Sequence, residues 1–172
     1  MKRLIDNMLG LQRLRAGFGL MNPAPVQIYP LLHEVAGHFW NPLVPPLIEI
    51  DCTPDLPPVH GEAVRLQEAM TNLLDNALKY SPTGSMIVLG AQADGDRVLL
   101  WVRDEGPGIP SDKQEKIFEQ FYRLEESRRA ASTGLGLALV REIAHAHGGR
   151  VWVESAPRQG STFYLSLPFA PG

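Results

Sequence analysis

The chain has 172 residues, and its 44% hydrophobic and 20% charged content is typical of a soluble globular protein with one sizeable core. A net charge of −3 argues against a nucleic-acid-binding protein, because nucleic acid requires a basic surface. The single cysteine excludes an intrachain disulfide and a cysteine-rich zinc site, and no apolar run approaches the roughly 20 residues that span a bilayer. We therefore expect a cytoplasmic chain without nucleic-acid or membrane contacts of its own, whether or not a longer parent protein is membrane-anchored.

The first 17 residues are expected to form a helix, because Leu4, Met8 and Leu11 recur at helical spacing along one seam. A helix of this length cannot bury an apolar seam by itself, so it is expected to need a partner helix from outside this chain. The alternative is that it packs against the remainder of its own chain.

A proline-rich linker at residues 22–25 follows this helix and divides the chain into two parts, 1–22 and 23–172. The second part begins with a pattern typical of a strand followed by a helix, at 26–40. Prolines then precede a short alternating segment at 47–51, which predicts a strand.

A helix at residues 65–80 is expected to carry two different faces. One face is apolar and consists of Leu66, Met70, Leu73, Leu74, Ala77 and Leu78. Glu68, Asn72, Asn76 and Lys79 line up on the other face over about three turns. A solvated face usually carries Lys, Glu and Arg, and Asn is a mediocre residue inside a helix. Because carboxamide oxygens suit Mg²⁺ and an ammonium group suits phosphate, this face indicates a site for a metal–phosphate group.

The segment after this helix reads as a hairpin, with strands at 86–93 and 97–103 joined at 94–96. A loop rich in glycine and proline follows at 104–110, and a short helix is expected at 112–119.

The last third of the chain begins with a polar stretch at 124–133, which we interpret as a mobile loop. The glycines at 134 and 136 open a helix that runs to about residue 147, and strands are expected at 150–154 and 162–167. The layout predicts an α+β fold, a two-layer sandwich of a mixed, mostly antiparallel sheet with helices on one face, plus an N-terminal helical stub.

Two glycine-containing segments carry weak chemical signals of their own. Asp104 stands at the end of a strand, where an ionised carboxylate can only accept hydrogen bonds and can therefore recognise an amino group. Gly106 and Gly108 permit a backbone that a flat ligand can approach closely. Gly134 and Gly136 at a helix start are suited to phosphate.

In this order, the segments resemble the catalytic, ATP-binding region of sensor histidine kinases, which belong to a superfamily shared with gyrase, mismatch-repair and heat-shock chaperone ATPases. Residues 68–80 resemble the N box of that family, and 104–109 resemble its first glycine box. Residues 117–123 are similar to its F box, and 133–139 to its second glycine box. The likeness extends over roughly residues 26–168.

The resemblance implies a role for each matching residue. Asn76 would coordinate Mg²⁺, Asn72 would hold phosphate or a bound water, and Glu68 would polarise the incoming nucleophile. Asp104 would accept from the adenine amino group, which disfavours guanine. The implied catalytic residues are Glu68, Asn72, Lys79 and Arg123. The implied nucleotide contacts are Asn72, Asn76, Lys79, Tyr80, Asp104, Gly106, Gly108, Ile109, Phe118, Arg123, Thr133, Gly134, Leu135, Gly136 and Leu137.

The resemblance also implies an activity and partners. The γ-phosphoryl group of Mg-ATP would pass to a histidine on a dimerisation hairpin, and the receiver domain of a response regulator would then take it. Residues 1–17 resemble the second helix of such a hairpin, and its first helix, with the acceptor histidine, is absent from this sequence. The fragment is therefore expected to bind ATP or ADP without phosphorylating itself.

Two other functions fit the same motifs. One is a nucleotide sensor without catalysis, against which the presence of Asn72, Asn76, Lys79 and Arg123 argues. The other is a serine kinase of the anti-sigma type, against which the helical seam of residues 1–17 argues.

Overall fold

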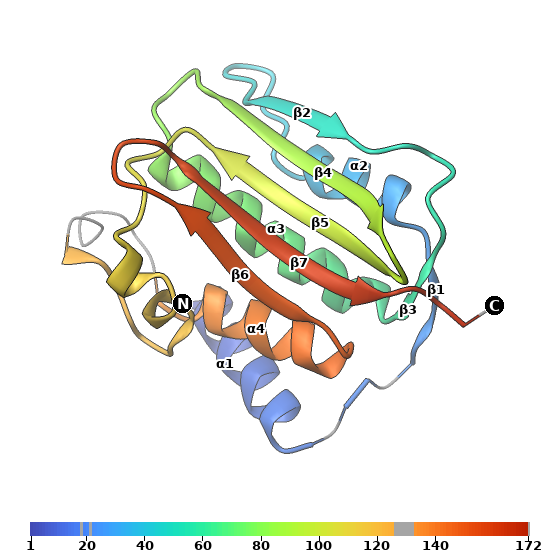
Figure 1. Cartoon of the computed structure of the whole chain (residues 1–172). Helices are drawn as coiled ribbons and strands as arrows, with labels where there is room; N and C mark the ends of the chain where they lie inside the picture. Colours follow the sequence, from blue (N-terminus) through green and yellow to red (C-terminus); the bar gives the residue numbers. More distant parts are fainter. Residues whose placement is uncertain (18, 21, 126–132, 172) are drawn as a thin grey trace.

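The computed structural model describes residues 1–17, 19–20, 22–125 and 133–171 (Figure 1). Its elements are α1 (Lys2–Arg15), β1 (Ala24–Val26), α2 (Ile28–Gly37), β2 (Leu47–Asp51), β3 (Val59–Gly61), α3 (Ala63–Tyr80), β4 (Met86–Asp94), β5 (Arg97–Asp104), η1 (Ser111–Lys113), η2 (Lys116–Phe118), α4 (Gly136–Ala146), β6 (Arg150–Ser155) and β7 (Ser161–Pro168). The polar stretch expected to be a mobile loop falls largely on residues 126–132, outside the described part of the chain.

A five-stranded sheet in the order β2-β4-β5-β7-β6 forms one layer of the molecule. The pair β2–β4 is parallel and the other neighbouring pairs are antiparallel. Helices α2, α3 and α4 all lie behind this sheet, on one face (Figure 1). The expected α+β sandwich with a mixed, mostly antiparallel sheet is therefore confirmed.

The core lies between the sheet and the helices, and the sequence periodicity explains how it forms. Alternate residues of β5, namely Val98, Leu100 and Val102, are buried against the helices, as period-two alternation requires. Leu66 and Leu73 represent the predicted apolar stripe of α3, which is buried as expected.

Helix α1 packs against its own domain on one side, so this chain buries part of the predicted seam without a partner from outside. Leu11 is 1% exposed, and Leu4 and Leu14 pack against the core. The contact is with α4, and Arg15 pairs with Glu142 there at 3.2 Å between Nε and Oε1. The buried seam is turned from the predicted one, because α4 covers the side of α1 that carries Asn7, Gly10 and Leu11.

Met8, which was expected to lie on the seam of the N-terminal helix, is 45% exposed. Ile5 and Leu9 are about equally exposed, at 51% and 49%. Helix α1 therefore has a second apolar face that the described residues of this chain do not cover.

The helix expected at 112–119 is wrong in type, because the segment forms two separate 3-10 turns, η1 and η2. The Gln114 side chain donates from Nε2 to the carbonyl oxygens of Ile109 and Ser155, at 3.0 and 2.8 Å. These bonds tie the residue between the two turns to the preceding loop and to the end of β6. Strand β3, which no pattern predicted, pairs with β1 in a separate two-stranded sheet.

His147 joins the C-terminus of α4 to the N-terminus of α3. Its Nδ1 lies 2.8 Å from the carbonyl oxygen of Ile143, and its Nε2 accepts the Glu62 N–H at 3.0 Å. Gly61 leaves room for the imidazole, since a Cβ there would lie 2.4 Å from a ring carbon. Burial lowers the pKa of His147, and the opposing effects of the Ile143 carbonyl and of Glu62 are smaller. The neutral ring is therefore the form that fits the fold.

We predict that the free energy of unfolding decreases as the pH falls below about 6.5, the ordinary histidine pKa. The unfolded chain then binds a proton that the folded His147 resists, so stability is lost with a slope of at most about 1.4 kcal/mol per pH unit. Urea titrations between pH 5 and 8 measure this slope. His147→Gln should flatten it, whereas His145→Gln, which removes an exposed ring two residues away, should leave it unchanged.

Candidate functional site

A cavity of about 190 Å³ opens between α3, the end of β5 and the segment that leads into α4. It brings together the polar side chains of α3 and residues of the two glycine-containing segments. The predicted site residues that line it are Asn72, Asn76, Lys79, Tyr80, Asp104, Ile109, Arg123, Thr133, Gly134, Gly136 and Leu137. The predicted site residues outside this lining are Glu68, Gly106, Gly108, Phe118 and Leu135.

Helix α3 supplies the polar wall of the cavity. Asn72, Asn76 and Lys79 follow one another at helical spacing, as predicted, and Asn72 is 8% exposed. Gly136, the first residue of α4, allows the two helices to approach here, because a Cβ on it would lie 3.2 Å from Asn72 Oδ1. The polar face of α3 and the first turn of α4 therefore border the same space.

Asp104 ends β5 and places a carboxylate at another wall of the cavity, where it is 8% exposed. Burial raises its pKa, and the backbone N–H groups of Gly106 and Ser161 oppose that shift without cancelling it. The Gly106 N–H donates to Oδ1 at 2.8 Å. A buried acceptor of this kind favours a ligand that brings a further N–H donor.

The two glycines after Asp104 shape the loop rather than line the cavity. Gly108 has a φ of +76°, and a Cβ there would lie 1.9 Å from the Ala156 carbonyl oxygen. At Gly106 a Cβ would lie 2.9 Å from Asp104 Oδ1. Any side chain at either position would displace the loop that holds the Asp104 carboxylate.

Phe118 and Leu135 belong to the core behind the cavity, where they are 4% and 1% exposed. Phe118 packs edge-on against Phe163, which does line the cavity, at 6.2 Å between ring centroids. Glu68 Oε2 is paired with Arg65 Nη1 of the same helix at 2.8 Å.

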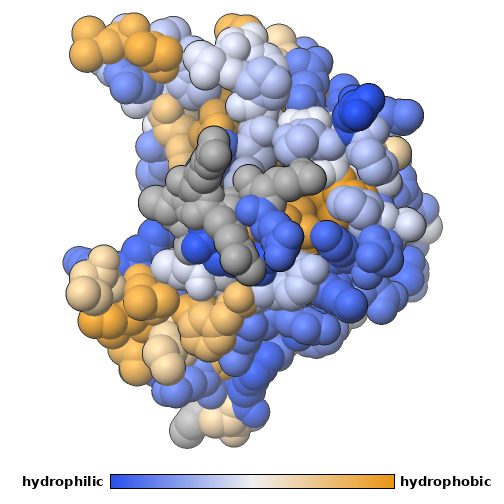
Figure 2. Space-filling model, turned by 90° about the vertical axis from the view of Figure 1, so that its left-hand side faces the viewer, coloured by the Kyte–Doolittle hydropathy of each residue, from blue (hydrophilic) through white to orange (hydrophobic). Residues whose placement is uncertain are grey.

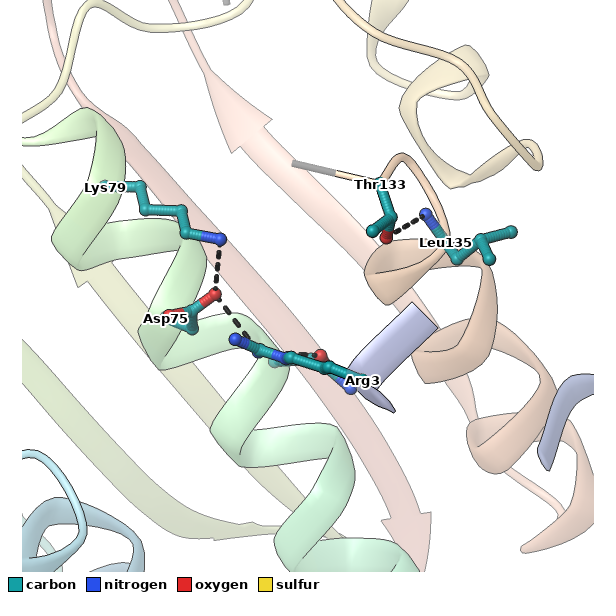
Figure 3. Close-up of polar contacts among 6 residues, drawn as sticks. Arg3, Asp75, Lys79, Thr133 and Leu135 are labelled. Carbon is teal, nitrogen blue, oxygen red and sulfur yellow. Dashed lines mark hydrogen bonds and ion pairs between the residues drawn. The ribbon is translucent and has the colours of Figure 1, made fainter. Parts of the chain in front are cut away.

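Two charged residues of the cavity wall, Arg3 and Asp75, were not among the site residues predicted from the sequence. Asp75 Oδ2 lies 3.1 Å from Arg3 Nη2 and 3.0 Å from Lys79 Nζ, so one carboxylate bridges two cations (Figure 3). The spacing of Asp75 four residues before Lys79 was a readable signal. Arg3 had no such signal, because it reaches the cavity only through the packing of α1.

In the described part of the chain, no group of three or more His, Cys, Asp or Glu side chains is arranged to hold a metal ion. Mg²⁺ does not require such a group, because it usually keeps several waters and takes further ligands from the phosphates of a substrate. Of the helices that the structure describes, none has the length and apolar character needed to cross a membrane.

Comparison with known proteins is consistent with this site. The family of histidine kinase-, DNA gyrase B-, and HSP90-like ATPases matches residues 61–171. The chain is 42% identical over 125 residues to the adaptive-response sensory kinase SasA of Nostoc sp., covering 72% of this chain and 31% of that protein. The SasA of Synechocystis sp. is 37% identical over 171 residues, covering 98% of this chain and 45% of that protein. The chain thus spans about a third to a half of these relatives.

Solved structures agree with the sequence relatives. Full-length ShkA in complex with AMPPNP superimposes with a TM-score of 0.86 at 32% identity, over 99% of this chain and 36% of that one. The nucleotide-free catalytic domain of the histidine kinase ThkA gives a TM-score of 0.76 at 26% identity, over 87% of this chain and 97% of that one. The chain therefore belongs to the family of histidine kinase-, DNA gyrase B-, and HSP90-like ATPases, and its fold is that of a histidine kinase ATP-binding catalytic domain.

Proposed function

We propose that this domain binds Mg-ATP in the cavity and that its parent protein transfers the γ-phosphoryl group to a histidine on a dimerisation hairpin. The observation that carries the proposal is that one cavity joins the Asn72, Asn76 and Lys79 side chains to the buried Asp104 carboxylate. A carboxylate suits the adenine amino group, and the polar face of α3 suits metal-bound phosphates. Full-length ShkA, whose structure contains AMPPNP, supports the same ligand class.

Adenine recognition is assigned to Asp104. Its carboxylate already accepts the Gly106 N–H, and the remaining acceptor sites can take the exocyclic amino group of adenine. Guanine presents a carbonyl oxygen at that position, which would face an acceptor and leave it unsatisfied at a cost of ~1–3 kcal/mol. Tyr80 and Ile109 supply neighbouring walls for the base.

The phosphates are assigned to the space between α3 and the start of α4. Asn76 would hold Mg²⁺ through its carboxamide oxygen, with the phosphates as further ligands, and the ion would neutralise charge on the transferring group. Asn72 and Lys79 would position the phosphate chain. Arg123, which lines the same cavity, and the backbone at Gly136 complete this end of the site.

Phosphoryl transfer requires a protein to position the reacting groups and to neutralise charge, and this chain supplies both functions. We propose no covalent intermediate on the chain. Glu68 is the acidic residue proposed to polarise the acceptor. Because Glu68 is paired with Arg65 outside the cavity lining, that role requires the pair to open when the acceptor docks.

We assign residues 1–22 to the second helix of the hairpin and its linker, and 23–172 to the ATP-binding domain. The exposed Ile5, Met8 and Leu9 of α1 support this assignment, since they form an apolar face for a further helix. Figure 2 shows an apolar area in the lower part of the face on which α1 lies. In the parent protein, a response regulator would receive the phosphoryl group, and the domain would work in the cytoplasm.

The proposal predicts that the isolated chain binds Mg-ATP but forms no acid-labile phosphohistidine. Supplying the missing hairpin helix, in cis or in trans, should produce it, as measured with γ-labelled ATP. Asn76→Ala should reduce transfer at least tenfold by removing the metal ligand, whereas Gln67→Ala on the same helix, which removes a side chain bonded to Glu34, should not. Nucleotide binding without transfer in the complete hairpin protein would favour the nucleotide-sensor alternative.

A second prediction concerns Asp104. Asp104→Asn should weaken Mg-ATP binding about 10- to 100-fold in calorimetry, because the amide presents a donor to the adenine amino group. The same variant should stabilise the nucleotide-free domain, because the raised pKa means that the folded state holds the ionised carboxylate less favourably than the unfolded state does.

The pH dependence separates these two effects. In the nucleotide-free wild type, the contribution of Asp104 to stability is present below its ordinary pKa and is lost as the pH rises through the raised pKa. The affinity for nucleotide should have the opposite pH dependence. It should fall as the pH decreases through the raised pKa of Asp104. Urea titrations of the wild type and of Asp104→Asn between pH 4 and 7 measure the difference in stability. Identical pH profiles of stability for the two proteins would contradict the assignment of this pH dependence to Asp104.

A further inference from the structure

Helix α1 lies outside the matched family region at 61–171, yet its second helical residue lines the cavity. Arg3 Nη2 lies 3.1 Å from Asp75 Oδ2 and donates to Asn72 Oδ1 at 3.5 Å. Both acceptors are on α3, and Asn72 is one of the residues proposed to hold phosphate. Figure 3 shows Arg3 and Lys79 reaching the same Asp75 carboxylate from two directions.

The packing of α1 keeps Arg3 at this place. Leu11 is fully buried, and near the other end of the helix Arg15 pairs with Glu142 of α4. Helix α1 lies close to both α3 and α4 at Gly10, where a Cβ would lie 3.3 Å from Arg65 Nη1 and 3.6 Å from a Leu139 methyl carbon. Arg3 is thus presented to the cavity by a helix anchored along most of its length.

The charges at this end of the cavity suit an anionic chain. Arg3 and Lys79 carry two positive charges, and the Asp75 carboxylate between them carries one negative charge. The Arg3 side chain is half-exposed, and a guanidinium group has five N–H donors, so it can keep its bond to Asp75 while it donates to a phosphate oxygen. On another wall of the cavity, Asp104 carries a negative charge and therefore has the opposite preference for the charge of a ligand group.

We propose that Arg3 is a phosphate-binding residue of the nucleotide site, supplied by α1 rather than by the ATP-binding domain proper. The inference rests on the proposed function, because it concerns the same cavity. The recognised group is the terminal phosphate of an adenine nucleotide. Docking of α1 and binding of the polyphosphate chain therefore favour each other, and by linkage each strengthens the other by the same factor.

The test compares two arginines that both anchor α1 through an ion pair, one at the cavity and one away from it. Arg3→Gln and Arg15→Gln are titrated calorimetrically with Mg-ATP, Mg-ADP and adenosine. Arg3→Gln should weaken Mg-ATP binding about tenfold and Mg-ADP binding less, and should leave adenosine binding unchanged. Arg15→Gln should change the affinities for the three ligands equally or not at all. Arg3→Lys should bind Mg-ATP more tightly than Arg3→Gln does, because it keeps the positive charge.

Three results would contradict the inference. An equal loss for adenosine and Mg-ATP in Arg3→Gln, matched by Arg15→Gln, would show that Arg3 only anchors α1. Tighter Mg-ATP binding in Arg3→Gln would show that the guanidinium group competes with phosphate. Wild-type affinity for Mg-ATP in Arg3→Gln would show that it makes no contact. If the wild-type protein itself bound no adenine ligand, the proposed function would fail, and this outcome is distinct from the other three.

Discussion

Helix α3 has to meet two demands with one sequence, and the geometry of the site depends on how it does so. Its apolar stripe, with Leu66 and Leu73 fully buried, fixes the helix against the sheet. This orientation of the helix about its axis also directs Asn72 and Asn76 into the cavity, because the apolar and the polar face follow the same 3.6-residue period. A shift that optimised core packing by a few degrees would therefore also move the polar wall. Core packing and ligand positioning cannot be adjusted separately on such a helix.

Sequence periodicity was sufficient for the elements that bury one face. The strands at 86–93 and 97–103 and the helix at 65–80 were expected within a few residues of their observed bounds, because alternation and helical spacing are local properties. The cavity could be anticipated in part for the same reason. Residues that share a helix face, such as Asn76 and Lys79, line the cavity together, and Asp104 ends its strand as expected.

The remaining features depend on contacts between segments that are distant in sequence. Between the two 3-10 turns at 111–118, Gln114 bonds to Ser155 of β6, and β3 exists because β1 pairs with it. The role of Phe118 also changes for this reason, since Phe163 of β7 holds its ring behind the cavity. Arg3 reaches the site only because α1 folds back onto α4. None of these partners is visible in a local pattern.

The attachment of α1 has a mechanical consequence. The helix is fixed at one end to α3 through Arg3 and Asp75 and near the other end to α4 through Arg15 and Glu142, so it bridges two walls of the cavity. A rotation or axial movement of α1 would have to break these two half-exposed ion pairs and the packing of Leu11, or carry α3 and α4 with it. In the second case the cavity that α3 and the start of α4 border would change its shape.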